Sequence, residues 1–165
     1  MTTASMSDRE IRTDRMRYVK NTASSRLCYL AILLNVLYFV SIYKSDVGSW
    51  YYQILVGGSI VYNLLFMLMV FLASEGVKSY QKNYSWMLYV IGILQAVRIF
   101  ILPMQAHSAV IKLGSVETVV METPQFIRCA LHLVLSAACL FVGAFVGMTR
   151  SKQLSAHLKA LGLTA

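Results

Sequence analysis

Four long apolar runs, separated by short polar segments, dominate the pattern of the chain. They cover residues 27–43, 51–73, 85–103 and 126–148. A run of about 20 apolar residues, wound as a helix, crosses a hydrocarbon core about 30 Å thick. Charged side chains are rare inside the runs and gather between them. The pattern therefore predicts an all-α integral membrane protein, a bundle of four transmembrane helices formed by residues 27–148.

The segments on either side of this predicted bundle are polar. In the basic N-terminal segment, residues 1–26, a capping-box pattern at residues 7–10 predicts a short amphipathic helix. In residues 149–165, Leu154 and Leu158 lie on one face at helical spacing. We therefore expect a second amphipathic helix, in a C-terminal tail, that lies on the membrane surface or docks on a partner.

The segment between the third and fourth runs has the composition of strands. Two stretches of β-prone residues flank Gly114 and Ser115, which together form a two-residue turn signal. We expect a small extracytoplasmic β-hairpin over residues 107–122, with open edges for a partner; an irregular loop or a short interfacial helix is the alternative. The turn sets the register and places opposite charges across from one another twice. The expected pairs are Leu113 with Val116, Lys112 with Glu117, Ile111 with Thr118, Val110 with Val119 and His107 with Glu122.

Basic residues are distributed unevenly between the two sides of a four-span chain. Eleven Lys or Arg residues fall on the side of the two chain ends, and three fall on the other. Cytoplasmic segments collect Lys and Arg, so both termini are expected in the cytoplasm, and short loops suggest a bacterial inner membrane. The eleven are Arg9, Arg12, Arg15, Arg17, Lys20, Arg26, Lys78, Lys82, Arg150, Lys152 and Lys159; the three are Lys44, Lys112 and Arg128.

The net charge of +8 follows from this topology. Basic residues next to a membrane are attracted to anionic lipids, and the sequence shows no recognised nucleic-acid-binding motif. Membrane lipids are therefore expected partners, together with other membrane subunits or further copies of the chain, and nucleic acid is not.

Each predicted span carries a face of small or polar residues. Polar groups inside a membrane are costly and usually face the protein interior, so four such faces predict one shared interior. It is either a polar network or an anion site. The residues assigned to it are Asn35, Asn63, Gln95, Arg98, Arg128 and His132.

Arg98 is the residue of this set that most needs a partner, because it lies well inside the third run. No Asp or Glu occurs in any of the four runs. An acidic partner would have to come from a loop (Asp46, Glu117 or Glu122), from another subunit or from a bound anion. The alternative is structural, with Arg98 bonded to Asn, Gln or backbone carbonyl groups.

Two further groups of small residues have structural interpretations. Gly143 and Gly147 form a GxxxG pattern that lets two membrane helices approach closely. The three cysteines, Cys28, Cys129 and Cys139, are far apart and show no metal-binding spacing. We therefore expect Gly143 and Gly147 at a helix contact, and the cysteines as packed small residues.

The sequence lacks the motifs of phosphate binding, dinucleotide binding and zinc hydrolysis. It predicts no metal, no cofactor and no enzymatic activity. The favoured function is a non-catalytic subunit or accessory protein of a larger membrane complex, of the transport or export kind. The alternative is a small homo-oligomeric channel or transporter whose polar interior favours anions. A membrane enzyme acting on lipid is a third hypothesis.

Overall fold

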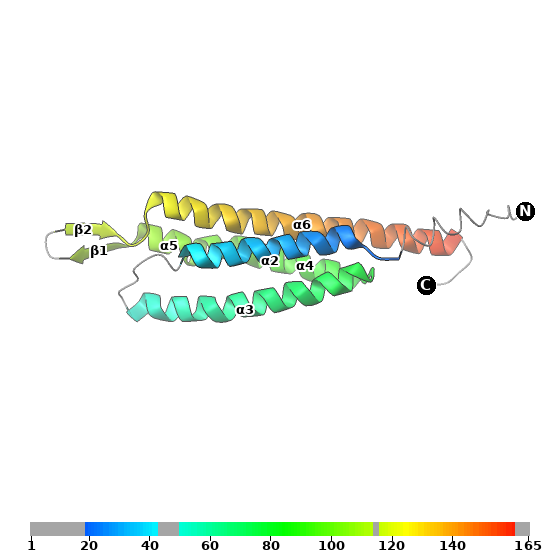
Figure 1. Cartoon of the computed structure of the whole chain (residues 1–165), viewed down its shortest axis with the longest axis horizontal. Helices are drawn as coiled ribbons and strands as arrows, with labels where there is room; N and C mark the ends of the chain where they lie inside the picture. Colours follow the sequence, from blue (N-terminus) through cyan, green and yellow to red (C-terminus); the bar gives the residue numbers. More distant parts are fainter. Residues whose placement is uncertain (1–18, 43–49, 114–115, 161–165) are drawn as a thin grey trace, which may run out of the picture.

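The computed structural model describes residues 19–42, 50–113 and 116–160, and these form a bundle of long helices (Figure 1). Within the described residues, four helices are long and apolar enough to cross a membrane. Large apolar side chains are exposed along all four, as expected for a lipid-facing surface. The prediction of four membrane-length helices is confirmed. These helices are α2 (Thr22–Ile42), α3 (Trp50–Lys78), α4 (Lys82–Ile101) and α6 (Thr123–Ala160).

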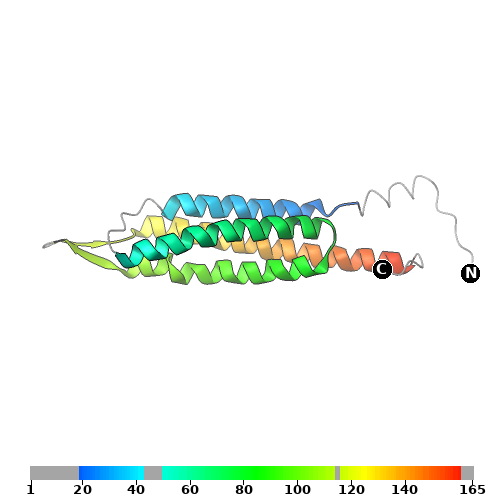
Figure 2. The ribbon, with the colours of Figure 1, turned by 90° about the horizontal axis from the view of Figure 1, so that it is seen from below.

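The helices α2 and α4 both pack along α6, whereas α3 lies on the opposite side of the bundle and contacts mainly α2 and α4. Figure 1 shows α3 leaning away from its neighbours toward the end where it begins. Seen from below, α3 lies in front of α6, between α2 and α4 (Figure 2). The bundle therefore has one tightly packed side, around α6, and one looser side, around α3.

Small residues allow α6 to approach its neighbours closely. The hydroxyl of Ser24 on α2 donates to the carbonyl of Gly143 at 2.6 Å. A Cβ atom on Gly147 would lie only 2.5 Å from Cγ1 of Val77 and 2.7 Å from Oγ of Ser85. Gly143 and Gly147 are thus both at helix contacts, which is where their spacing placed them.

Helix α6 differs from the expected arrangement of the C-terminus. It continues unbroken to Ala160, so residues 149–160 extend the last membrane helix instead of forming a separate tail helix. Neither Gly nor Pro occurs between Met148 and Ala160, and Lys, Gln, Leu and Ala favour helix. The amphipathic helix predicted near the N-terminus falls on residues 1–18, which lie outside the described part of the chain.

The hairpin predicted over residues 107–122 is wrong in its extent and needs correction. Most of the described chain is helical, and the strands are short: β1 (Val110–Leu113) and β2 (Val116–Val119). They pair antiparallel, with Val110 opposite Val119, and project past the helix ends in both views (Figures 1 and 2).

The region before the strands is helical. A short helix, α5 (Pro103–Ser108), contains His107 and begins with a proline at a first-turn position, where the missing N–H is not needed. His107 therefore does not pair with Glu122 as a strand residue. Its Nδ1 instead lies 3.1 Å from the Met121 carbonyl oxygen, and its ring stacks on Phe126 with centroids 4.8 Å apart.

The bundle interior is layered along its axis. One apolar cluster, near the α3–α4 turn, is built around Phe66, Leu88 and Leu140. A second, near α5, contains Leu102 and Leu133. Buried polar side chains lie between the two clusters on α2, α4 and α6, beside Ser59 and Asn63 of α3, and these form the candidate site.

Candidate functional site

Arg98 on α4 is the centre of the polar layer. Its side chain is 5% exposed, and its guanidinium reaches two other helices. Nη1 donates to Oδ1 of Asn35 at 3.1 Å and to Oδ1 of Asn63 at 2.8 Å. Nη2 donates to the hydroxyl of Ser59 at 2.8 Å. One cation therefore links α4 to both α2 and α3 through neutral oxygen acceptors.

Amide side chains complete the network and connect it to α6. Nδ2 of Asn35 donates to Oδ1 of Asn63 at 2.9 Å. Nε2 of Gln95 donates to Oδ1 of Asn35 at 3.0 Å and lies 3.4 Å from Oγ of Ser136. The Ser136 hydroxyl in turn donates to the carbonyl of Ala31 at 3.0 Å. All four membrane-length helices thus contribute to one hydrogen-bonded layer.

Two aromatic rings flank the guanidinium. Cζ of Arg98 lies 4.4 Å from the ring centroid of Tyr38 and 4.7 Å from that of Tyr62. A cation within about 6 Å of an aromatic centroid is attracted by the ring, more strongly where water is excluded. The rings therefore help to hold the charge inside the bundle.

Four of the six residues assigned to the polar interior come together, namely Asn35, Asn63, Gln95 and Arg98. Arg128 does not join them: it is exposed near the start of α6, where its Nε donates to the carbonyl of Pro124 at 3.2 Å.

His132 is half-buried on α6, and no hydrogen bond to its buried Nδ1 is found among the described residues. Of the acidic residues considered as partners for Arg98, Asp46 and the side chain of Glu117 lie outside the described part. Glu122 is exposed between β2 and α6.

Tyr62 was not among the residues predicted for the polar interior. Asn63 was assigned to the polar face of the second span, but the aromatic residue beside it was not. Tyr62 lies three residues after Ser59, on a neighbouring part of the same helix face. An aromatic residue at this spacing from a polar pair, opposite a buried arginine, is the signal that would have found it.

A groove opens between α3 and α4 beside the polar layer. Its volume is about 350 Å³, and most of the side chains that line it are apolar. Ser59, Tyr62 and Arg98 are the polar residues among them. The remaining lining residues are Ile54, Gly58, Leu94, Val97, Ile101 and Leu102.

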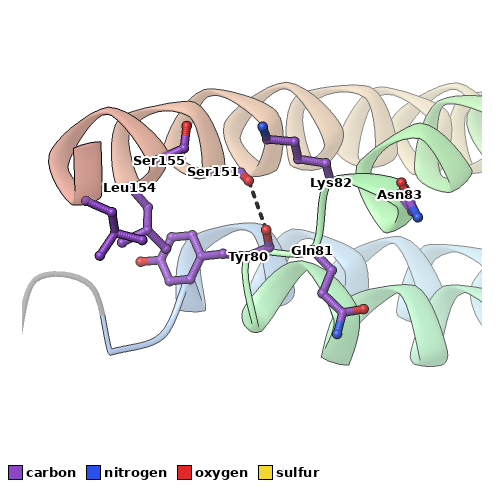
Figure 3. A pocket seen from close by; sticks show the side chains of 8 residues that line it. Tyr80, Gln81, Lys82, Asn83, Ser151, Leu154 and Ser155 are labelled. Carbon is purple, nitrogen blue, oxygen red and sulfur yellow. Dashed lines mark hydrogen bonds between the residues drawn. The ribbon is translucent and has the colours of Figure 1, made fainter. Parts of the chain in front are cut away.

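A second hollow, of about 410 Å³, lies at the α3–α4 turn beside the end of α6 (Figure 3). The hydroxyl of Ser151 donates to the carbonyl of Tyr80 at 2.9 Å and ties α6 to the turn. Figure 3 shows Leu154 beside Tyr80 on one side, and Lys82 and Asn83 on the other. The described residues that line this hollow carry apolar, hydroxyl, amide and cationic groups.

The polar layer is suited to holding helices together and to binding hydrogen-bond acceptors. The described side chains that form its hydrogen bonds are amides, hydroxyls and one guanidinium. In the described part of the chain, no group of three or more His, Cys, Asp or Glu side chains could hold a metal ion.

Comparison of the chain with protein-family models, with curated proteins and with solved structures finds no match.

Proposed function

We propose that this protein is a non-catalytic subunit or accessory protein of a larger membrane complex, of the transport or export kind. The observation that carries the proposal is the use made of the polar interior. Arg98, Asn35, Asn63 and Gln95 are engaged in bonds between helices, and apolar clusters lie on both sides of them. Such a layer stabilises a bundle, and among the described residues its hydroxyls and amides are bonded to one another and to Arg98, not to a general base.

The basic end of the bundle supports a docking role. Lys78 is paired with Glu75 at 2.9 Å. Lys82 at the α3–α4 turn, and Lys152 and Lys159 near the end of α6, are exposed. We propose that this end faces the cytoplasm of a bacterium, because cytoplasmic segments collect Lys and Arg.

Purification of the tagged protein from its native membrane in mild detergent, followed by mass spectrometry, tests the proposal. We expect at least one membrane protein to co-purify in fixed stoichiometry and to be lost when Lys152 and Lys159 are both changed to Glu. Arg128→Glu, on the opposite end of α6, is the matched control. Recovery of a monodisperse protein with no partner would contradict the subunit role.

The same preparation addresses the channel hypothesis. If the protein is isolated alone as a defined homo-oligomer, flux of chloride and other anions into liposomes becomes the deciding measurement. Flux abolished by Arg98→Ala in a folded protein would favour a channel over a subunit.

A further inference from the structure

The groove between α3 and α4 has the properties of a small-ligand site that opens to the membrane. Ligand sites are mostly apolar and contain a few polar groups that fix orientation, with volumes of about 300–1,000 Å³. At about 350 Å³, this groove is at the small end of that range. It has room for one short chain or head, and it is too small for a helix or for a lipid with two chains.

The polar wall of the groove is made of hydrogen-bond donors. The Ser59 hydroxyl accepts a bond from Arg98, and a hydroxyl that accepts one bond can still donate its own hydrogen, to Tyr38 or to a ligand in the groove. Tyr62 lines the groove with the face of its ring against the guanidinium. A ligand that carries two acceptor oxygens at one end and is otherwise apolar would match this wall.

The position of the groove narrows the choice of ligand. Arg98 and Ser59 lie inside membrane-length helices, and the open side of the groove is formed by exposed Ile54, Val97 and Ile101. The phosphate of a phospholipid stays charged and is held at headgroup level, whereas a carboxyl group can lose its charge by protonation and so reach below it.

We propose that the α3–α4 groove binds the carboxyl head of a single-chain fatty acid that enters sideways from the membrane. The carboxyl oxygens accept hydrogen bonds from the hydroxyls of Ser59 and Tyr62, and the chain lies along the apolar walls. The inference is independent of the proposed subunit role, because it concerns a site on the side of the bundle.

Two adjacent glycines provide a matched pair of variants. A Cβ atom on Gly57 or on Gly58 would meet nothing within 4 Å, so the bundle has space for a larger side chain at either position. Only Gly58 lines the groove. Gly58→Leu therefore places a leucine side chain inside the groove. Gly57→Leu places the same side chain outside it.

The experiment uses a twelve-carbon fatty acid that carries a photoreactive diazirine, added to the whole protein in phosphatidylcholine nanodiscs. We expect cross-links within residues 54–62 and 94–102. Labelling should fall by at least about tenfold in Gly58→Leu, and Gly57→Leu should label like the wild type. An otherwise identical probe without the carboxyl group should label these residues far less.

Tyr62→Phe gives a second, independent test, because it removes only a hydroxyl. Loss of one hydrogen bond should weaken labelling by about fivefold. This variant decides the question if Gly58→Leu fails to fold. If the probe labels lipid-facing residues uniformly on all four helices, the proposal is overturned. It is also overturned if a folded Gly58→Leu or Tyr62→Phe protein is labelled to the same extent as the wild type.

Discussion

At the scale of single residues, the interior of this bundle is specified by a few polar side chains with defined partners. Among the described residues, Arg98 donates hydrogen bonds across helix boundaries to Asn35, Asn63 and Ser59. Inside a membrane, apolar contacts distinguish poorly between helix neighbours because the lipid is equally apolar. The polar layer therefore sets which helix faces turn inward.

Replacing the guanidinium tests this role. We expect Arg98→Met to lower the free energy of unfolding by about 2 kcal/mol, since three bonds are lost and each contributes about 0.6 kcal/mol in a membrane protein. Unfolding by denaturing detergent, followed by circular dichroism, measures the change. Arg128→Met, at an exposed position, should stay within about 0.5 kcal/mol of the wild type, and an equal loss in both variants would argue against a special role for Arg98.

The sequence was sufficient to find the helix faces of this layer and insufficient to give the depth of each residue. Asn35, Asn63, Gln95 and Arg98 could be assigned because spacings of three and four place neighbours on one face. Arg128 lies on a similar stripe of α6, but it lies too near the start of the helix to reach the layer. The depth of Arg128 in the membrane depends on the position of α6 along the bundle axis relative to the other helices. The spacing of residues in the sequence does not give this position.

At the scale of elements, the α3–α4 turn shows how the chain reverses direction without glycine. The N–H of Tyr80 donates to the carbonyl of Val77, and the N–H of Gln81 donates to the carbonyl of Gly76. This is the Schellman pattern of helix ends. Tyr80 takes the position usually filled by glycine, with a φ of 61°, which is unfavourable for a residue with a Cβ atom.

Comparing glycine with alanine at this position isolates the backbone effect, because both variants lose the tyrosine ring. We expect Tyr80→Gly to be more stable than Tyr80→Ala by about 1 kcal/mol. At Gln81, where φ is −76°, the order should reverse, with alanine the more stable. Thermal unfolding in one detergent measures all four variants, and the same order at both positions would refute the explanation.

The two glycines of α6 should respond differently to the same change. A Cβ atom on Gly147 would press on Val77 and Ser85, whereas on Gly143 the nearest atom, Cβ of Leu27, lies at an ordinary 3.5 Å. We expect Gly147→Ala to lose about 1–3 kcal/mol from overpacking. Gly143→Ala should be neutral or gain up to about 1 kcal/mol from helix propensity. Thermal unfolding distinguishes them, and equal losses would mean that the two contacts are equally tight.

The segment between α4 and α6 marks the limit of local sequence rules for elements. A two-residue turn signal and β-prone neighbours predicted strands back to His107. Pro103 favours the start of a helix, and α5 extends far enough to include His107. The sequence contained both the turn signal and the helix-start signal. Helix forms at His107 because α5 packs against α4 and α6, a contact that the local sequence does not show.

At the scale of the whole molecule, four membrane-length helices place the α3–α4 turn and the end of α6 at the same end of the bundle (Figure 1). The hydrogen bond from the Ser151 hydroxyl to the Tyr80 carbonyl shows that the end of α6 contacts this turn. Helix α5 lies at the other end. Exposed positions at the two ends should therefore face opposite sides of a membrane.

Cysteine labelling tests this arrangement in a variant whose Cys28, Cys129 and Cys139 are changed to alanine. Cysteines introduced at exposed Gln153 and Lys82 should react with a membrane-impermeant maleimide from one side of sealed vesicles. A cysteine at Glu122, which is exposed between β2 and α6 and lies outside the candidate spans, should react only from the other side. Labelling of all three from the same side would contradict a four-span topology.

The central position of α6 has a consequence for how the protein is made. Helices enter a membrane in chain order, yet most of the packing of α2 and α4 is against α6, which is synthesised last. Until α6 arrives, Ala31 and Gln95 lack their partner Ser136. Before α6 is inserted, α2 and α4 therefore lie in the membrane with some polar groups lacking their hydrogen-bond partners. Quality-control proteases should recognise that intermediate, so chains interrupted before Thr123 should be degraded quickly.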